Sequence, residues 1–87
     1  MTTRTLNYYT DPAHGWLAVD RADLDRLDIT HRISPYSYQQ NDKVYLEEDL
    51  DMTLFMEAAN DKGWNVTMKY QHTNKDSRIR SLPHFQP

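Results

Sequence analysis

In VYLEEDLDMTLFMEAA (Val44 to Ala59) a short strand-like pattern is followed directly by a helical pattern. The segments on either side of it indicate the rest of the fold. The helical part is apolar at intervals of three and four residues, which is the spacing of an amphipathic helix. This apolar face holds Leu50, Leu54, Phe55, Ala58 and Ala59. Because Gly63 is a natural stop, the pattern predicts a helix from about Asp49 to Lys62.

Strands are predicted on both sides of this helix. After it, WNVTMKYQH (Trp64 to His72) alternates apolar and polar residues with a period of two, the clearest strand signal in the chain. Before it, RISPYSYQQNDKVYLEE (residues 32–48) predicts a hairpin, because Gln40-Asn41-Asp42 supplies turn chemistry between β-prone residues. Pro35 lacks an N–H group and indicates a strand start or an edge position.

The N-terminal third predicts a second hairpin followed by a short helix. Arg4 to Thr10 and Trp16 to Val19 are β-prone, and the DPAHG segment between them forms a tight connection in which Gly15 allows a positive φ. Asp20 is a good N-cap for the helix that follows, with Val19 packing on Leu24 as a hydrophobic staple.

The predicted order is ββαββαβ, a two-layer α+β domain with two helices on one face of a largely antiparallel sheet. We expect residues 1–87 to form a single domain. The last part, from about residue 73 to residue 87, lacks regular periodicity and is predicted to be an irregular tail that docks through Ile79, Leu82 and Phe85.

Composition excludes several functional classes. The chain has 87 residues, no cysteine and a net charge of −3, so disulfides, thiolate metal sites and a cysteine nucleophile are ruled out. MTTRTLNYYT (residues 1–10) lacks the apolar segment of a secretion signal, and no apolar run reaches the ~18 residues of a membrane helix. We therefore expect a cytoplasmic protein with no membrane association.

No catalytic, metal or cofactor site is predicted. The four histidines (His14, His31, His72 and His84) are scattered without a metal-ligand spacing, and no nucleophile elbow is present. We expect a protein that is not an enzyme and has no metal and no cofactor.

The acidic cluster Glu47, Glu48, Asp49 and Asp51 has three interpretations. Carboxylates in the first turn of a helix stabilise it, but one or two of them suffice for that purpose. A metal or catalytic site would need oxygens converging on one point, and the spacing is not that of a calcium loop. The third interpretation is a contact surface, since residues 42–61 carry seven acids against one lysine, a net of −6.

Two further groups of residues could contact a partner. The chain has six tyrosines, of which some must be core and others face outward. Exposed tyrosine near arginine is typical of binding hot spots, so Tyr36, Tyr38 and Tyr45 are added to the acidic face; the alternative is that tyrosine fills a shallow core. The C-terminal part is basic, and its cationic side chains could bind the phosphates of a nucleic acid. These cations are Lys69, Lys75, Arg78 and Arg80.

Four segments of the chain carry a resemblance to a family. YYTDPAHGW, ISPYSY, VYLEEDLD and HTNKDSRIRS, in this order, resemble the motifs of a family of short uncharacterised proteins encoded by bacteriophages and other mobile elements. The likeness covers nearly the whole chain. Ala13 and Asp28 stand where the family usually has glycine. The resemblance implies an accessory protein acting inside a bacterial host, and it implies no particular activity.

Together these features predict a small phage accessory protein that binds and inhibits or modulates a host protein, such as a nuclease or another defence component. The predicted contact residues are Glu47, Glu48, Asp49, Asp51, Tyr36, Tyr38 and Tyr45. The alternative is a nucleic-acid-binding protein that uses Lys69, Lys75, Arg78 and Arg80. In either case we expect a monomer or a homodimer in the host cytoplasm.

Overall fold

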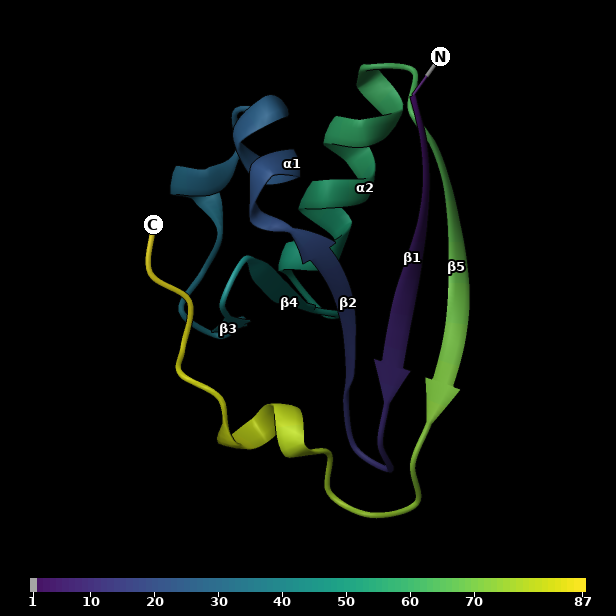
Figure 1. Ribbon diagram of the computed structural model, residues 1–87, viewed down its shortest axis with the longest axis vertical. Coiled ribbons are helices and arrows are strands. Elements are labelled where there is room, and N and C mark those ends of the chain that lie inside the picture. The colour runs from purple at the N-terminus through teal and green to yellow at the C-terminus, as the bar shows by residue number, and fades with distance from the viewer. Residues whose placement is uncertain (1) are drawn as a thin grey trace.

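The computed structural model describes residues 2–87 as a five-stranded mixed sheet with two α-helices and two short 3-10 turns (Figure 1). The strands are β1 (Thr3–Thr10), β2 (Gly15–Asp20), β3 (Tyr38–Gln40), β4 (Lys43–Glu47) and β5 (Asn65–His72). The helices are α1 (Arg21–Arg26) and α2 (Asp51–Asp61), and the 3-10 turns are η1 (Thr30–Arg32) and η2 (Arg78–Ser81). The predicted ββαββαβ order is therefore confirmed.

The sheet order is β3-β4-β2-β1-β5. The pairs β1–β2, β2–β4 and β3–β4 are antiparallel, whereas β5 returns after α2 to lie parallel to β1 along its full length. Asn41, in the two-residue turn between β3 and β4, has a φ of 55°, a conformation that asparagine tolerates well. The prediction of a largely antiparallel α+β sheet holds, with one parallel pair.

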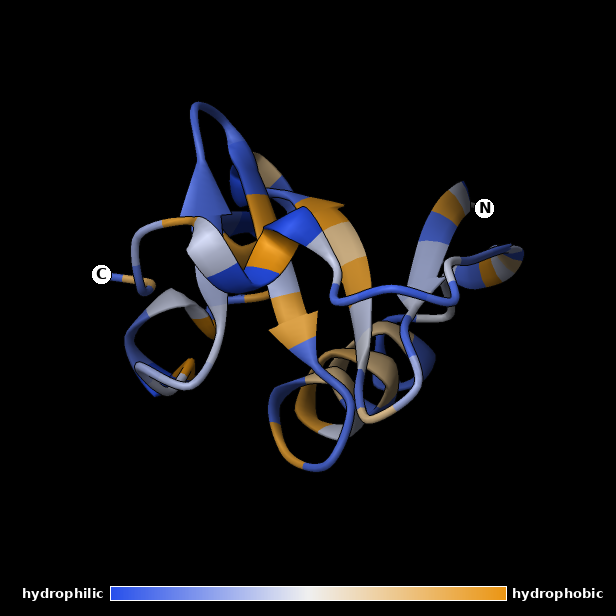
Figure 2. Cartoon of the chain, turned by 90° about the horizontal axis from the view of Figure 1, so that it is seen from below, coloured by the Kyte–Doolittle hydropathy of each residue, from blue (hydrophilic) through white to orange (hydrophobic). Residues whose placement is uncertain are grey.

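Both helices pack on the same face of the sheet. Leu24 of α1 and Phe55 and Ala59 of α2 join the buried strand residues in one hydrophobic cluster. Those strand residues are Leu6, Leu17, Val19, Val44 and Leu46. In Figure 2 the strongly hydrophobic residues gather on the central strands and the helices beside them, whereas the loops are mostly hydrophilic. Because side chains alternate along a strand, the residues next to these core positions face the other side of the sheet.

The C-terminal segment covers the β3 edge of the sheet. It turns after β5, forms η2 and runs back past β3, where the main chain of Gln39 bonds to Pro83 and that of Phe85 to Ser37 (Figure 1). Ile79 and Phe85 are buried, as predicted, and Leu82 stays partly exposed. Within residues 2–87, no helix is long and apolar enough to cross a membrane.

Two local interpretations need correction. Gly63 has a φ of 75° as expected of a helix stop, but Gly15 is not in the positive-φ region. What requires glycine at position 15 is space, since an added Cβ would lie 2.3 Å from the Tyr8 hydroxyl oxygen. Leu50 does not lie on the buried helix face either: it precedes the first turn of α2 and is 51% exposed.

Candidate functional site

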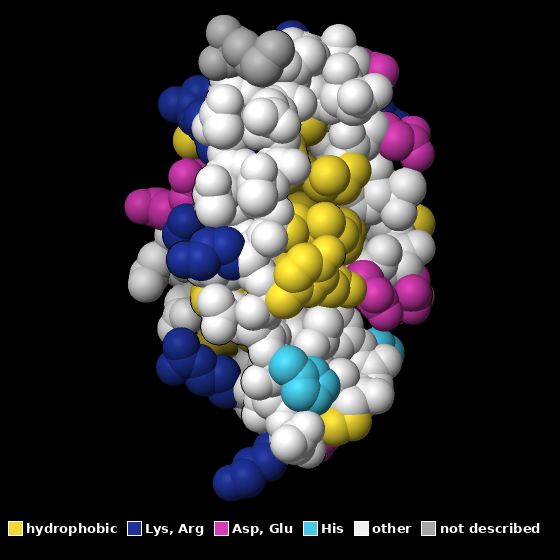
Figure 3. Space-filling model, turned by 90° about the vertical axis from the view of Figure 1, so that its right-hand side faces the viewer, with side chains coloured by type: hydrophobic (Ala, Val, Ile, Leu, Met, Phe, Trp, Pro, Cys, Tyr) yellow, Lys and Arg dark blue, Asp and Glu magenta, His cyan; other side chains and the backbone are white. Residues whose placement is uncertain are grey.

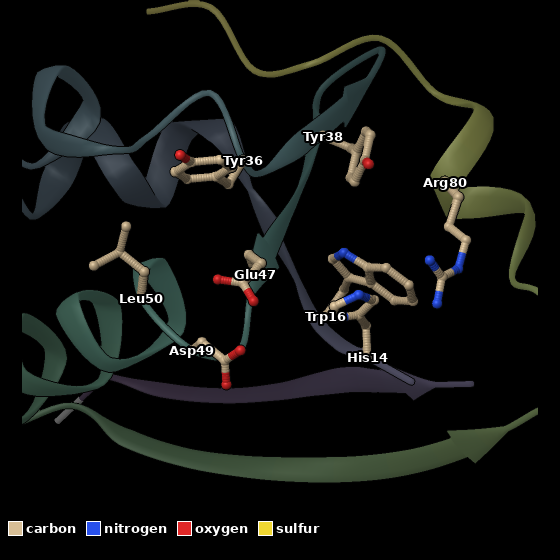
Figure 4. Close-up of a pocket in the computed structure, with 8 residues that line it drawn as sticks. All are labelled: His14, Trp16, Tyr36, Tyr38, Glu47, Asp49, Leu50 and Arg80. Atoms are coloured by element: carbon tan, nitrogen blue, oxygen red, sulfur yellow. The ribbon is translucent and has the colours of Figure 1, made fainter. Parts of the chain in front are cut away.

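A pocket of about 390 Å³ opens on the face of the sheet opposite the helices (Figure 4). It is built where β2, β3 and β4 meet the turn before β2, the loop before α2 and η2. Its lining residues are His14, Trp16, Tyr36, Tyr38, Glu47, Asp49, Leu50 and Arg80. The pocket thus combines aromatic walls with both acidic and basic side chains.

Trp16 forms the floor of the pocket. Its side chain alternates with the core residue Leu17, so it faces away from the helices, and it is only 2% exposed. The ring lies 6.4 Å from the Tyr38 ring and 6.0 Å from the His14 ring, centroid to centroid. Its indole nitrogen points toward the space below Tyr36 and beside Glu47 (Figure 4). It makes no hydrogen bond to residues 2–87, and since those residues hold no buried side-chain N or O atom without a partner, the nitrogen is accessible from the pocket.

Glu47 and Asp49 supply negative charge on one side of the pocket. Neither carboxylate takes part in the ion pairs found among residues 2–87. The pKa of Glu47 is raised, mainly by burial and further by the charges of Asp49 and Asp51. The backbone N–H of Asp49 and the nearby His14 act in the opposite direction and lower it. A positive group entering the pocket would relieve this unfavourable environment, since a nearby cation stabilises the ionised carboxylate.

Arg80 lies across the pocket from these acids, but its charge is already matched. Its Nε and Nη2 atoms donate to the two oxygens of buried Asp11 at 2.6 and 3.0 Å, and its guanidinium carbon sits 5.6 Å from the Trp16 ring centroid. Asp11 also accepts backbone N–H bonds from Ala13, His14 and Ser77. The pair therefore joins the turn before β2 to the C-terminal segment and orients Arg80 on the Trp16 ring.

This ion pair predicts a pH-dependent stability. The hydrogen bond from Arg80 holds the pKa of Asp11 well below its usual range, and the backbone N–H donors add to this effect against the cost of burial. A lowered folded-state pKa stabilises the fold above the ordinary aspartate pKa of about 3.9, and the contribution is lost as pH falls below it. We expect Asp11→Asn to lower the melting temperature by several degrees at pH 7, with a difference from wild type that shrinks between about pH 5 and pH 2.

Thermal unfolding followed by circular dichroism across this pH range measures the difference. Asp61→Asn, at the exposed end of α2, is the control and should change the melting temperature little at any pH. A deficit of Asp11→Asn that is equally large at pH 2 and pH 7 would contradict the assignment.

Asp51 anchors the loop that carries Tyr36, and it is not part of an exposed acidic face. Its carboxylate is 1% exposed and accepts bonds from the backbone N–H and hydroxyl of Ser34 and from the hydroxyl of Ser37. The Ser37 hydroxyl oxygen accepts in turn from the N–H of Glu47 at 3.0 Å. The prediction that Asp51 contacts a partner is therefore wrong, because its hydrogen bonds are used to hold the pocket walls together.

Glu48 and Tyr45 also lie outside the pocket. Glu48 accepts a 2.8 Å bond from the Tyr8 hydroxyl, and burial together with this bond raises the pKa of Tyr8 to about 12. Tyr45 is half-buried and packs against Tyr9, with ring centroids 6.2 Å apart. Of the seven predicted contact residues, the fold brings four into one pocket: Tyr36, Tyr38, Glu47 and Asp49.

The other four lining residues were not predicted to join them. His14 lies in the predicted DPAHG connection, Leu50 on the predicted apolar helix face, and Arg80 among the predicted phosphate contacts. The sequence does hold one signal, because each of the four segments quoted for the family resemblance contributes to the lining. No rule of sequence spacing would have shown that these distant segments meet.

The basic residues of the C-terminal part differ in their surroundings. Lys69, Lys75 and Arg78 are exposed, whereas Arg80 is bound to Asp11. Figure 3, which faces β5, shows lysine and arginine side chains spaced along the left margin beside a continuous apolar band. In the part of the chain from Thr2 to Pro87, no group of three metal-ligating side chains was found.

Comparisons with protein-family models, with curated proteins and with solved structures found no match to this chain.

Proposed function

We propose that this protein is a non-enzymatic accessory protein that binds a host protein through the pocket and thereby inhibits or modulates it. The observation that carries the proposal is the convergence of Tyr36, Tyr38, Glu47 and Asp49 on one open concave site. These four residues come from the ISPYSY segment and the acidic segment, which the β3–β4 hairpin and the loop before α2 place side by side.

The rim of the pocket has the composition of a protein contact. Tyr36 is 69% exposed and Leu50 is 51% exposed, which leaves two large apolar side chains in water beside the site. Tyrosine, tryptophan and arginine are the residue types most enriched in binding hot spots. A partner that covered Tyr36 and Leu50 would bury apolar surface that the isolated chain leaves exposed.

The acidic charge of the pocket suits a basic partner surface. The C-terminal arginines do not neutralise Glu47 and Asp49, because Arg80 is paired with Asp11 instead. The resemblance to phage proteins supports a bacterial host protein as the partner, such as a nuclease of a defence system. The two carboxylates would then occupy positions where such an enzyme holds phosphates.

A capture experiment tests the proposal. Tagged wild type and the double variant Glu47→Lys/Asp49→Lys are incubated with bacterial host lysate, and the bound proteins are identified by mass spectrometry. We expect at least one host protein to be retained by wild type and reduced at least about tenfold by the variant, because charge reversal at a desolvated contact costs several kcal/mol. Circular dichroism confirms that the variant is folded.

The matched control is Glu57→Lys/Asp61→Lys, which makes the same charge change at exposed positions on α2. Equal capture by wild type and both variants would contradict a role for the pocket. Recovery of nucleic acid instead of protein, with an affinity that falls steeply with salt, would support the alternative site at Lys69, Lys75 and Arg78.

A further inference from the structure

We propose that the pocket holds one arginine side chain of the partner, together with the peptide carbonyl next to it. This inference rests on the proposed function and specifies the chemistry that the same site recognises. It follows from three features of the pocket: its aromatic walls, two carboxylates that form no ion pair with residues 2–87, and an indole N–H that finds no acceptor among the same residues.

The aromatic walls favour a planar cation. Trp16, Tyr36 and Tyr38 line the cavity. Arg80 already lies over the Trp16 ring and His84 stacks on Tyr38, so Tyr36, which is 69% exposed, is the most open of the three rings. Cations are attracted to the faces of such rings. Guanidinium is more weakly hydrated than ammonium and stacks on aromatic faces, which makes arginine a better occupant than lysine. The fold itself uses this chemistry in three places, with Arg4 over Trp64, Arg21 over Phe85 and Arg80 over Trp16.

The charged residues of the pocket indicate that its ligand is a cation. Among residues 2–87, Glu47 and Asp49 have no ion-pair partner, whereas the cation of Arg80 is held at 2.6 Å by Asp11. An incoming anion would therefore meet two carboxylates and no free arginine. An incoming guanidinium can donate to Glu47 in the two-bond geometry that carboxylates favour.

The third feature is the indole N–H of Trp16. The residue is 2% exposed, and its nitrogen points into the pocket (Figure 4). The nitrogen makes no hydrogen bond to residues 2–87 and is not one of their buried atoms, so a ligand can reach it from the pocket. Guanidinium has no acceptor atom, so this donor must be satisfied by another part of the ligand. A peptide carbonyl beside the arginine supplies it, which favours an arginine within a protein chain. A cavity of about 390 Å³ lies at the small end of the ~300–1,000 Å³ range of ligand pockets, consistent with one side chain and its adjoining main chain.

Binding should weaken in acid. A guanidinium binds the ionised form of Glu47, whose pKa is raised by burial and by Asp49 and Asp51 and lowered by the N–H of Asp49 and by His14. As pH falls through this raised pKa, a proton neutralises Glu47 and the cation loses its partner. Affinity is therefore expected to decrease on the acid side.

Nuclear magnetic resonance gives a direct test because the chain has only two tryptophans. The ¹⁵N-labelled protein is titrated with acetyl-Gly-Arg-Gly-amide, and the two indole N–H signals are followed; Trp16→Phe identifies the Trp16 signal. We expect that signal to shift with a Kd of about 1 mM, the affinity of a few favourable contacts. The Trp64 signal should stay in place, since Trp64 already packs against Arg4.

Matched probes and variants separate the contributions. The citrulline peptide has the same shape without the charge, and we expect it to bind at least about tenfold more weakly, as should the lysine peptide. Glu47→Gln/Asp49→Asn should abolish the shift, whereas Glu57→Gln/Asp61→Asn should preserve it. The unchanged Trp64 signal reports that each variant is folded.

Three results would overturn the assignment to arginine: no Trp16 shift up to about 20 mM peptide, equal binding of the citrulline or lysine peptide, or equal shifts of both indole signals. If host-protein capture depends on Glu47 and Asp49 while the peptide moves no signal, the proposed function stands and the arginine assignment falls. Peptide binding without charge-dependent capture would overturn the proposed function instead.

Discussion

Asp51→Ala is expected to lower the free energy of unfolding by about 3 kcal/mol, because buried donors that lose their acceptor each cost about 1–3 kcal/mol. The Asp51 carboxylate accepts from the Ser34 N–H and hydroxyl and from the Ser37 hydroxyl, and it is 1% exposed. Alanine offers none of these bonds and leaves a small cavity where the carboxylate stood. Urea unfolding followed by tryptophan fluorescence measures the change.

Two variants make this result specific. Asp51→Asn keeps one side-chain oxygen and should cost about half as much, since part of the hydrogen bonding survives. Asp49→Ala removes a neighbouring carboxylate that is exposed and should change the free energy of unfolding by less than about 0.5 kcal/mol. Equal effects of Asp49→Ala and Asp51→Ala would show that Asp51 is not the buried anchor described above.

Phe55→Ala is expected to cost about 3–5 kcal/mol, the usual range for removing a fully buried aromatic ring. Phe55 is 0% exposed and packs from α2 into the single hydrophobic cluster shared with the central strands. For a domain of this size the loss corresponds to a decrease of about 20 °C in melting temperature. Differential scanning calorimetry would detect it, and a variant that is already unfolded at 25 °C would agree with the same expectation.

The comparison variants for this position are Phe55→Leu and Met56→Ala. Leucine keeps most of the apolar volume, so Phe55→Leu should cost about 1–1.5 kcal/mol. Met56 follows Phe55 on α2 but is only partly buried, and its truncation should cost less than that of Phe55. If Met56→Ala were as damaging as Phe55→Ala, the orientation of α2 on the sheet would be wrong.

The order of the elements could be predicted because each one depends on local chemistry. The alternation from Trp64 to His72 predicts β5, and the apolar spacing with Gly63 as the stop predicts α2. Two local interpretations failed, one because of a residue distant in sequence and one because the helix begins later than expected. Gly15 is required by the nearby Tyr8 ring, and Leu50 is kept out of the core by its place before the first turn of α2.

The candidate site could be predicted only in part. Surplus acids and exposed tyrosines indicated Tyr36, Tyr38, Glu47 and Asp49, and these four do line the pocket. Asp51 belongs to the same acidic run, but whether a carboxylate faces water or a pair of serine hydroxyls depends on how the loop before β3 packs on α2. The same is true of Trp16. Its position in a strand shows that its side chain lies on one of the two faces of the sheet, but the sequence does not indicate which face the helices cover.

By itself the sequence determined the strands, the helices and the excess of negative charge between residues 42 and 61, because periodicity, capping and charge are properties of neighbouring residues. Only the tertiary structure decided which charged side chains remain available to bind a partner. It pairs Arg80 with Asp11 across 69 positions of the chain and buries Asp51 against Ser34 and Ser37. Glu47 and Asp49, which line the pocket with Trp16, form no ion pair within the described part of the chain, residues 2–87. The physical reason is that ion pairing and burial depend on distances in space, and these are set when β2, β4 and the C-terminal segment pack together.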